Sequence, residues 1–204
     1  MSLWAIVPVK PLRRGKSRLS GVLSEEERTV LNFSMLAHTL EVAGSVAKID
    51  QILVISRDPA ALALAREHDA RTVQEERNSS LNPALRRATI VAQAYASDGV
   101  LILPADLPLL QKEDLDEIIR HAVDPPVMVI VPDRRRKGTN ALLIRPPGTI
   151  DYAYGPNSFH NHVEHGRRQG LRVDICDIPS VGLDLDLPED LDLIRQLNPM
   201  QIKL

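Results

Sequence analysis

The sequence predicts an α/β protein, with a mainly parallel β-sheet flanked by helices on both faces. Short apolar runs, such as residues 51–56 and 100–104, alternate along the whole chain with longer amphipathic stretches, which is the pattern of repeated βα units. The chain has 204 residues, of which 44% are hydrophobic and 25% are charged, and these are enough to bury one full core. No repeat, low-complexity tract or linker divides it, so we expect a single domain over residues 1–204.

The first half of the chain alternates strands with well-signalled helices. Ser24 and Glu27 form a capping box, and Asp58 followed by Pro59 is typical of a helix start. The expected elements are, in order, a strand over 3–8, a helix from Ser24 to about Gly44, a strand over 51–56, a helix from Asp58 to about Asp69, a strand over 70–74, a helix from Asn82 to about Ala96 and a strand over 100–104.

The second half continues the same alternation. A basic segment over 133–138 joins two apolar runs, which we expect to be neighbouring strands. The expected elements are a helix over about 112–122, strands over 127–132 and 140–145, a helix over about 157–169, a strand over 171–176 and a terminal helix from Pro188. Parallel strands in such units are connected by right-handed crossovers.

Composition narrows the class of function. The net charge of −2 and the sequence pI near 6.3 argue against a broad nucleic-acid-binding face. The single cysteine, Cys176, cannot form an internal disulfide and is expected to be a buried thiol. Pro8 and Pro11 interrupt the apolar N-terminus too early for a signal peptide or a membrane span, so we expect a cytoplasmic protein without a membrane partner.

Three aspartates are the most informative candidates for chemistry. Asp184 and Asp186 are two residues apart, so on an extended segment their side chains point to the same side. Asp106 follows the apolar run 100–104 and could meet them at the edge of the sheet. Clustered carboxylates repel one another unless a cation neutralises them, and their hard oxygens suit Mg²⁺ carried on a phosphate substrate. The alternative is that the pair only forms a turn before the helix at Pro188.

The first loop carries five cationic side chains at the place where a phosphate-binding turn would lie. They are Lys10, Arg13, Arg14, Lys16 and Arg18. The Gly15-Lys16-Ser17 triplet resembles the end of a P-loop, but Lys10 stands where the earlier glycine is required, so that motif fails. These cations could neutralise a triphosphate, or the loop could simply be a solvated basic surface.

Five blocks along the chain resemble one enzyme family. WAIVPVKPLRRGKSRL, LPADLPLL, GTNALLIRPP, YGPNSFHNH and GLDLDLPEDL occur in the order seen in the 2-phospho-L-lactate guanylyltransferases, whose close relatives act on phosphoenolpyruvate. The resemblance covers nearly the whole chain. It implies a nucleotidyltransferase domain of the nucleotide-diphospho-sugar transferase type, which joins GMP from GTP to a phosphorylated three-carbon acid and releases pyrophosphate in coenzyme F-420 biosynthesis.

The resemblance also assigns roles to residues. It places Asp106, Asp184 and Asp186 at the metal-binding carboxylates, expected to hold two Mg²⁺ ions. Thr139, Gly155 and Ser158 match the positions that hold the phosphate and carboxylate of the acceptor acid, although they could instead be a strand start, a turn and a helix cap. Leu81 and Asn82 match the segment along the nucleoside, in a stretch over 78–85 where Ser80 replaces the usual glycine. Asn82 could equally be an ordinary helix cap.

We expect direct in-line attack by the acceptor phosphate on the α-phosphorus of GTP, with catalysis by positioning and charge neutralisation. The residues expected to act in catalysis are Lys16, Arg18 and Asp106, and those expected to bind the nucleotide are Lys10, Arg13, Lys16, Leu81 and Asn82. Lys16 ranks first among the cations.

Other interpretations stay open. His160, His162 and His165 suggest zinc, but only His162 and His165 would share a helix face and no thiolate joins them. The resemblance places His162 where it would orient the acceptor loop. A nucleotidyltransferase acting on a sugar phosphate or a pterin cofactor, and a non-catalytic nucleotide sensor, are the alternative functions. The sequence does not decide between phosphoenolpyruvate, 2-phospho-L-lactate and 3-phosphoglycerate, nor does it fix the oligomeric state.

Overall fold

The computed structural model describes residues 2–76 and 80–197, so residues 78 and 79 of the stretch compared with the nucleoside segment lie outside the described residues. The strands are β1 (Leu3–Val9), β2 (Gln51–Ser56), β3 (Arg71–Gln74), β4 (Gly99–Ile102), β5 (Val127–Pro132), β6 (Thr139–Arg145) and β7 (Arg172–Ile175). The α-helices are α1 (Glu25–Ser45), α2 (Pro59–Glu67), α3 (Leu81–Ala94), α4 (Lys112–His121), α5 (Ser158–Arg168), α6 (Pro179–Gly182) and α7 (Pro188–Leu197). Two short 3₁₀ helices, η1 (Leu12–Arg14) and η2 (Ser17–Leu19), lie in the first loop.

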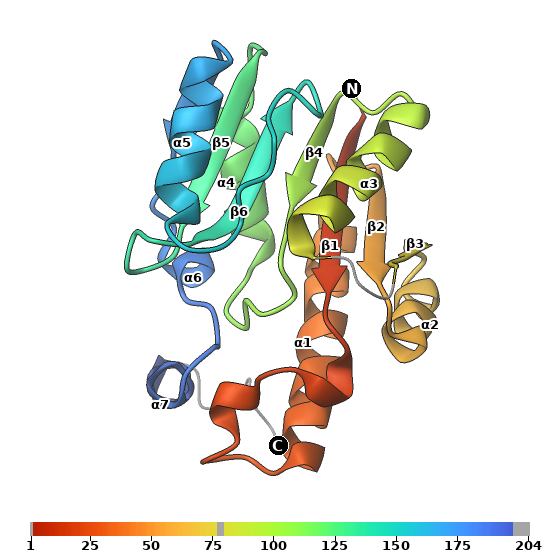
Figure 1. The fold of residues 1–204 in the computed structure, drawn as a ribbon, viewed down its shortest axis with the longest axis vertical. Coiled ribbons are helices and arrows are strands. Elements are labelled where there is room, and N and C mark those ends of the chain that lie inside the picture. The colour runs from red at the N-terminus through yellow and green to blue at the C-terminus, as the bar shows by residue number, and fades with distance from the viewer. Residues whose placement is uncertain (1, 77–79, 198–204) are drawn as a thin grey trace.

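The strands form one seven-stranded sheet in the order β3-β2-β1-β4-β6-β5-β7. β1 pairs in parallel with β2 and β4, as β2 does with β3 and β5 with β7. β6 runs antiparallel to both of its neighbours, β4 and β5. The predicted mainly parallel sheet is therefore confirmed. Because β6 is reversed, its first residues lie at the edge where β1 and β4 end (Figure 1).

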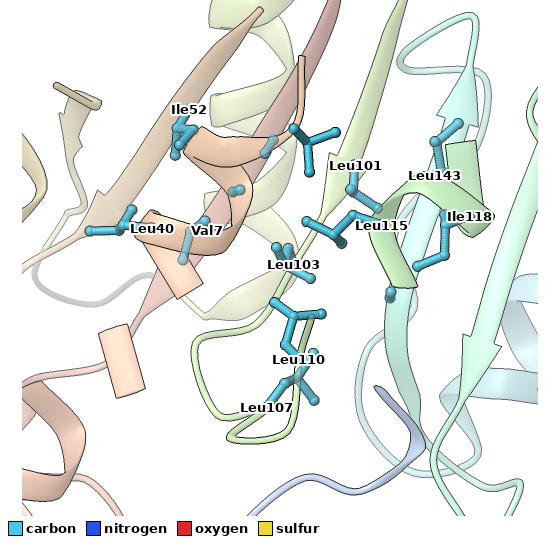
Figure 2. Close-up of a cluster of buried hydrophobic side chains, with 14 of the residues drawn as sticks. Val7, Leu40, Ile52, Leu101, Leu103, Leu107, Leu110, Leu115, Ile118 and Leu143 are labelled. Carbon is cyan, nitrogen blue, oxygen red and sulfur yellow. The ribbon is translucent and has the colours of Figure 1, made fainter. Parts of the chain in front are cut away.

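Alternate residues of each central strand enter opposite cores. Ala5 and Val7 of β1 face a cluster formed with α1, α2 and α4, whereas Trp4 and Ile6 face a cluster formed with α3 and α5. Figure 2 shows part of the first cluster, in which Leu40 of α1 lies near Val7 and Leu115 of α4 lies near Leu101. Helices on both faces bury the sheet, as the sequence predicts.

A third cluster lies beyond the sheet edge and joins the two ends of the chain. Leu19 and Leu23 from the first loop pack with Leu185, which precedes α7, and with Leu191 of α7. Figure 1 shows α7 beside the first loop, below the sheet. This packing brings the cationic loop next to the Asp184–Asp186 segment, although 170 residues separate Lys16 from Asp186.

The predicted helices and strands are all present, with ends that differ by a residue or two. Ser24 and Glu27 form the expected capping box, and Asp58 caps α2 through Ala60. The proposal that Asn82 caps α3 is wrong, because Ser80 is the N-cap and the Asn82 side chain is bonded elsewhere. Ser158 is likewise the first residue of α5 and not its cap. The two 3₁₀ helices and α6 are too short to show a periodic pattern, so the sequence did not predict them.

Candidate functional site

A cavity of about 560 Å³ opens where β1 and β4 end and β6 starts. Its lining comes from the loop after β1, the segment after β4, the starts of α3, β6 and α5, and the segment that contains Asp184 and Asp186. Ligands of open α/β sheets bind in this kind of crevice, beyond the carboxyl ends of the strands. We call Lys16, Asp106, Asp184 and Asp186 the ionic wall. We call Thr139 and Ser158, which line the cavity, together with His162, which is bonded to Thr139 and does not line it, the neutral wall.

Lys16 holds the ionic wall together. Its Nζ atom lies 2.8 Å from Asp106 Oδ2 and 2.9 Å from Asp186 Oδ1, and the side chain is only 8% exposed. Burial lowers the pKa of Lys16, but the charges of Asp106 and Asp186 outweigh burial and raise it overall, so the amine stays protonated. An ammonium group has three donors, and these two aspartates take two of them.

The backbone of the first loop directs Lys16 inward. Lys16 adopts a left-handed conformation, with φ of 55°. Gly15 precedes it, and a Cβ atom there would come within 2.6 Å of the Asn32 side chain. That Asn32 side chain donates to the Leu12 carbonyl oxygen at 2.6 Å, so the loop is fastened to α1. Gly15 is therefore required for close packing of the loop on α1, and not for a P-loop turn.

Backbone contacts bring the aspartates to one place. The Leu185 amide donates to the Asp106 carbonyl oxygen at 3.0 Å, which joins the segment after β4 to the Asp184–Asp186 segment. Asp190 Oδ2 accepts from the amides of Asp186 and Leu187, at 3.1 and 2.8 Å, and α7 begins at Pro188. The alternative that this segment forms a turn before α7 is therefore also correct, but the Asp190 carboxylate stabilises that turn. The Asp184 and Asp186 carboxylates do not bond to it and line the cavity.

Asp184 differs from the other two aspartates in its partners. Its Oδ1 atom accepts from Asn140 Nδ2 at 3.2 Å. Burial, and then the negative charge of Asp106, raise the pKa of Asp184 to about 6, and the Asn140 bond opposes this only partly. The pKa of Asp186 is lowered instead, because Lys16 outweighs the effect of burial. The ionic wall therefore has one carboxylate whose charge is poorly compensated.

The neutral wall is built from buried hydroxyl and imidazole groups. Thr139 Oγ1 lies 2.9 Å from His162 Nδ1, and Ser158 Oγ donates to Thr139 Oγ1 at 3.3 Å. His162 Nε2 accepts from the Ala153 amide at 2.9 Å. Burial, followed by the neighbouring His165, lowers the pKa of His162 to about 4, so the ring is neutral at neutral pH. Both ring nitrogens of His162 therefore have hydrogen-bond partners within the protein.

Asn82 links α3 to the loop before α5. Its Nδ2 atom donates to the Tyr154 carbonyl oxygen at 3.1 Å, and its Oδ1 atom accepts from the Tyr154 amide at 2.9 Å. Both polar ends of the amide are thus engaged, and Asn82 does not line the cavity. The Tyr154 side chain does line it, and its buried hydroxyl has no hydrogen-bond partner within the described part of the chain. Buried polar groups nearly always have a hydrogen-bond partner, so this hydroxyl is a candidate to bind a group that enters the cavity.

The structure gathers most of the sequence-predicted site residues but not all of them. The predicted residues that line the cavity are Lys10, Lys16, Leu81, Asp106, Thr139, Ser158, Asp184 and Asp186. Gly155, with φ of 132°, borders the cavity residue Tyr154 without lining the cavity itself. Arg13 is exposed and outside it, and Arg18 lies at the rim, where its Nη1 atom is 3.5 Å from Asp186 Oδ2.

Sequence reasoning did not find Asn140, Tyr154 or Asp190. Asn140 donates to Asp184, Tyr154 has a buried hydroxyl without a partner among the described residues, and Asp190 shapes the turn. The GTNALLIRPP, YGPNSFHNH and GLDLDLPEDL blocks contain all three residues, so the signal was their position inside the blocks that carry the resemblance.

The ionic wall is not a preformed metal cage. Within residues 2–76 and 80–197, no three His, Cys, Asp or Glu side chains stand close enough to hold a metal ion together. The Lys16 ammonium lies between Asp106 and Asp186 and contributes the cationic charge there. The oxygen donors and the raised pKa of Asp184 are nevertheless the chemistry that a hard divalent cation would satisfy.

Fold and site together define a nucleotidyltransferase class of protein: a mainly parallel sheet whose carboxyl edge joins a cationic loop, acidic residues and hydroxyl donors around one cavity. A family model described as CofC-like guanylyl transferase matches residues 3–196. The chain belongs to this family of guanylyl transferases.

Named relatives cover almost the entire chain. A phosphoenolpyruvate guanylyltransferase from Rubrobacter xylanophilus is 42% identical over 203 residues, which are 100% of this chain and 98% of that protein. A 2-phospho-L-lactate guanylyltransferase from Methanothermobacter thermautotrophicus is 36% identical over 94% of this chain and 83% of its own length.

Solved structures support the fold. A candidate nucleotide-diphospho-sugar transferase from Desulfovibrio desulfuricans G20 superposes with a TM-score of 0.79 at 16% identity, over 98% of this chain and 89% of that one. The predicted nucleotide-diphospho-sugar transferase type of fold is thereby confirmed. No helix in the described part of the chain is long and apolar enough to cross a membrane.

Proposed function

We propose that this protein transfers the guanylyl group of GTP to the phosphate of a phosphorylated three-carbon acid, phosphoenolpyruvate or 2-phospho-L-lactate, and releases pyrophosphate. The observation that carries the proposal is the division of one cavity into an ionic wall and a neutral wall. A triphosphate needs charge neutralisation, and a small acid needs directional donors. The relatives named for these two acids support the same reaction. We propose that it is an early step in coenzyme F-420 biosynthesis.

The reaction needs little acid–base chemistry from the protein. A phosphate monoester is largely ionised at neutral pH, so its oxygen can attack the α-phosphorus without a strong general base. Lys16 supplies a buried positive charge next to the place proposed for the triphosphate, and Lys10 adds an exposed one at the rim. The neutral wall would hold the acid in line for attack.

Asp106, Asp184 and Asp186 are the residues that would hold Mg²⁺. They line the same cavity with hard oxygen donors, and Asp184 has a poorly compensated charge. Bound Mg²⁺ would neutralise the triphosphate and orient it. Lys16 holds two of the three carboxylates in place and keeps its own third N–H for an anion.

A pyrophosphate-release assay tests the proposal. Purified protein with GTP and Mg²⁺ is given phosphoenolpyruvate, 2-phospho-L-lactate or 3-phosphoglycerate in turn, and the product masses are measured. We expect release with one or both of the first two acids and the mass of a guanylyl diphosphate diester. ATP in place of GTP measures the purine preference. A sugar phosphate is tested in parallel, and release with it alone, or with none of the acceptors, contradicts the proposed function.

A further inference from the structure

The neutral wall contains a hydrogen-bond chain whose direction can be read from the identities of its atoms. It begins at the Ala153 amide, which lies 2.9 Å from His162 Nε2. A backbone amide can only donate, so Nε2 accepts and carries no proton. A neutral imidazole then carries its proton on Nδ1. Nδ1 lies 2.9 Å from Thr139 Oγ1, and it must therefore donate to that hydroxyl.

Thr139 receives a second bond on the same oxygen. Ser158 Oγ donates to Thr139 Oγ1 at 3.3 Å. A hydroxyl has one proton and two lone pairs, so two incoming bonds leave it only the role of donor. No described residue accepts a bond from the Thr139 hydroxyl, and Thr139 lines the cavity. Its proton is thus reserved for a group that enters the cavity.

The surroundings of His162 keep its ring fixed and neutral. The ring is fully buried, and Tyr154 packs against it edge-on, with ring centroids 4.8 Å apart and an interplanar angle of 69°. Burial, and then His165, lower the pKa of His162 to about 4, so protonation does not disturb the chain at neutral pH. A doubly protonated ring would also point an N–H at the Ala153 amide.

We propose that His162 is a positioning residue that fixes the Thr139 hydroxyl as a donor toward an anionic oxygen of the acceptor acid. The role in the acid's binding rests on the proposed function, whereas the direction of the bonds does not. His162 does not touch the reacting atoms, and it acts through Thr139. The arrangement favours a deprotonated phosphate or carboxylate at this position, because those groups only accept hydrogen bonds.

Two amide variants separate the two bonds of His162. In His162→Asn the amide lies near the position of Nδ1 and can still donate to Thr139, but it loses the bond to Ala153. In His162→Gln the amide reaches the position of Nε2 and can still accept from Ala153, but it cannot donate to Thr139. We expect the Gln variant to raise the KM for the acid roughly tenfold and the Asn variant only about threefold, with the KM for GTP unchanged in both.

A double variant checks that His162 acts through Thr139. Thr139→Val removes the hydroxyl, so adding His162→Gln to it should raise the acid KM little further. Thermal unfolding of each variant measures the structural cost separately. Equal KM increases in the Asn and Gln variants, or additive effects in the double variant, would show that His162 only supports the fold.

The proton position is measured without substrate. In protein labelled with ¹⁵N in its histidine rings, long-range ¹H–¹⁵N spectra show which nitrogen of His162 carries the proton. We expect Nδ1, and a proton on Nε2 overturns the inference whatever the enzyme does. Absence of turnover with every acid contradicts the proposed function instead, so the two failures are distinguishable.

Discussion

The two walls of the cavity are built from different kinds of interaction. On the ionic wall, Lys16 balances Asp106 and Asp186, whose side chains are 32% and 43% exposed. On the neutral wall, Thr139, Ser158 and His162 are nearly fully buried and joined by uncharged hydrogen bonds. Charges in partly exposed positions can exchange one ionic partner for another, whereas buried directional bonds fix atoms in one geometry.

This difference suggests that the two walls bind different substrates. The ionic wall can admit a highly charged triphosphate, because its groups interact through charge and accept new partners. The neutral wall can select a small acid, because its donors have fixed directions. Variants of the ionic wall should therefore reduce turnover more than stability, and variants of the neutral wall should affect acid binding and stability together.

Removal of a carboxylate charge should have the largest effect. We expect Asp106→Asn, Asp184→Asn and Asp186→Asn each to lower kcat on the order of 1,000-fold, because each removes charge from the proposed metal site. Steady-state kinetics over a range of Mg²⁺ concentrations, with thermal unfolding alongside, measure both effects. Asp177→Asn is the matched control, since that carboxylate is 67% exposed and pairs with Arg136 outside the cavity. Near-normal turnover at saturating Mg²⁺ in any two of the three variants refutes a shared metal site.

Replacement of Lys16 should have the next largest effect. Lys16→Met keeps the length of the side chain but removes the charge between Asp106 and Asp186, so we expect kcat to fall on the order of 100-fold. Lys16→Arg keeps the charge and should retain more activity. Arg18→Ala is the comparison at the rim, where the 68% exposed guanidinium should contribute severalfold at most. A larger loss in the Arg18 variant than in the Lys16 variant would reverse our ranking of the two cations.

Local signals made much of the fold predictable. The pattern of apolar residues predicted β1 to β7, and the Ser24–Glu27 capping box is present as expected. The approach of Asp184 and Asp186 to Asp106 was also expected, but strand ends do not produce it: the aspartate pair follows α6, and the Leu185 amide joins it to the Asp106 carbonyl oxygen.

Long-range contacts made the rest unpredictable. The position of β6 between β4 and β5 sets where Thr139 lies, and no local pattern encodes the order of the strands in a sheet. The partners of Asn82 and His162 depend on Tyr154 and Thr139, which are 72 and 23 residues away in the chain. An asparagine next to a proline looks like a cap in sequence, and only the folded chain shows that its amide is bonded to another loop.

Acid should weaken the neutral wall through His162. Folding lowers the pKa of His162 from 6.5 to about 4. Between pH 4 and pH 6.5 the unfolded chain therefore binds a proton on this ring more readily than the folded protein does. The stabilisation by the neutral ring is complete above about pH 6.5 and is lost as the pH falls toward 4. We expect it to amount to about 2–3 kcal/mol of unfolding free energy. Urea unfolding from pH 7 to pH 4 measures this loss, and His162→Asn should show a shallower decline. Equal slopes for the two proteins would mean that His162 is not the titrating group.

The smallest effect should come from Asn82, which joins α3 to the loop before α5 through the Tyr154 backbone. Asn82→Ala removes two hydrogen bonds and should lower the free energy of unfolding by about 1–2 kcal/mol. Because the Tyr154 loop leads into Ser158, we also expect a rise in the acid KM of a fewfold. The GTP-to-ATP ratio of kcat/KM should stay the same, since both polar atoms of Asn82 are engaged away from the cavity.

Gln93→Ala is the matched control for Asn82→Ala. It removes an amide on the same helix that donates to the Pro147 carbonyl oxygen at 2.9 Å, and Gln93 does not line the cavity. That variant should lose stability without a change in the acid KM. If Asn82→Ala instead narrows the preference for GTP and leaves the acid KM unchanged, then Asn82 exchanges its bonds to Tyr154 for bonds to the base. The amide of Asn82 would in that case recognise the base of the nucleotide through directional hydrogen bonds. Binding through charge and binding through directional bonds would then not be divided between the two walls.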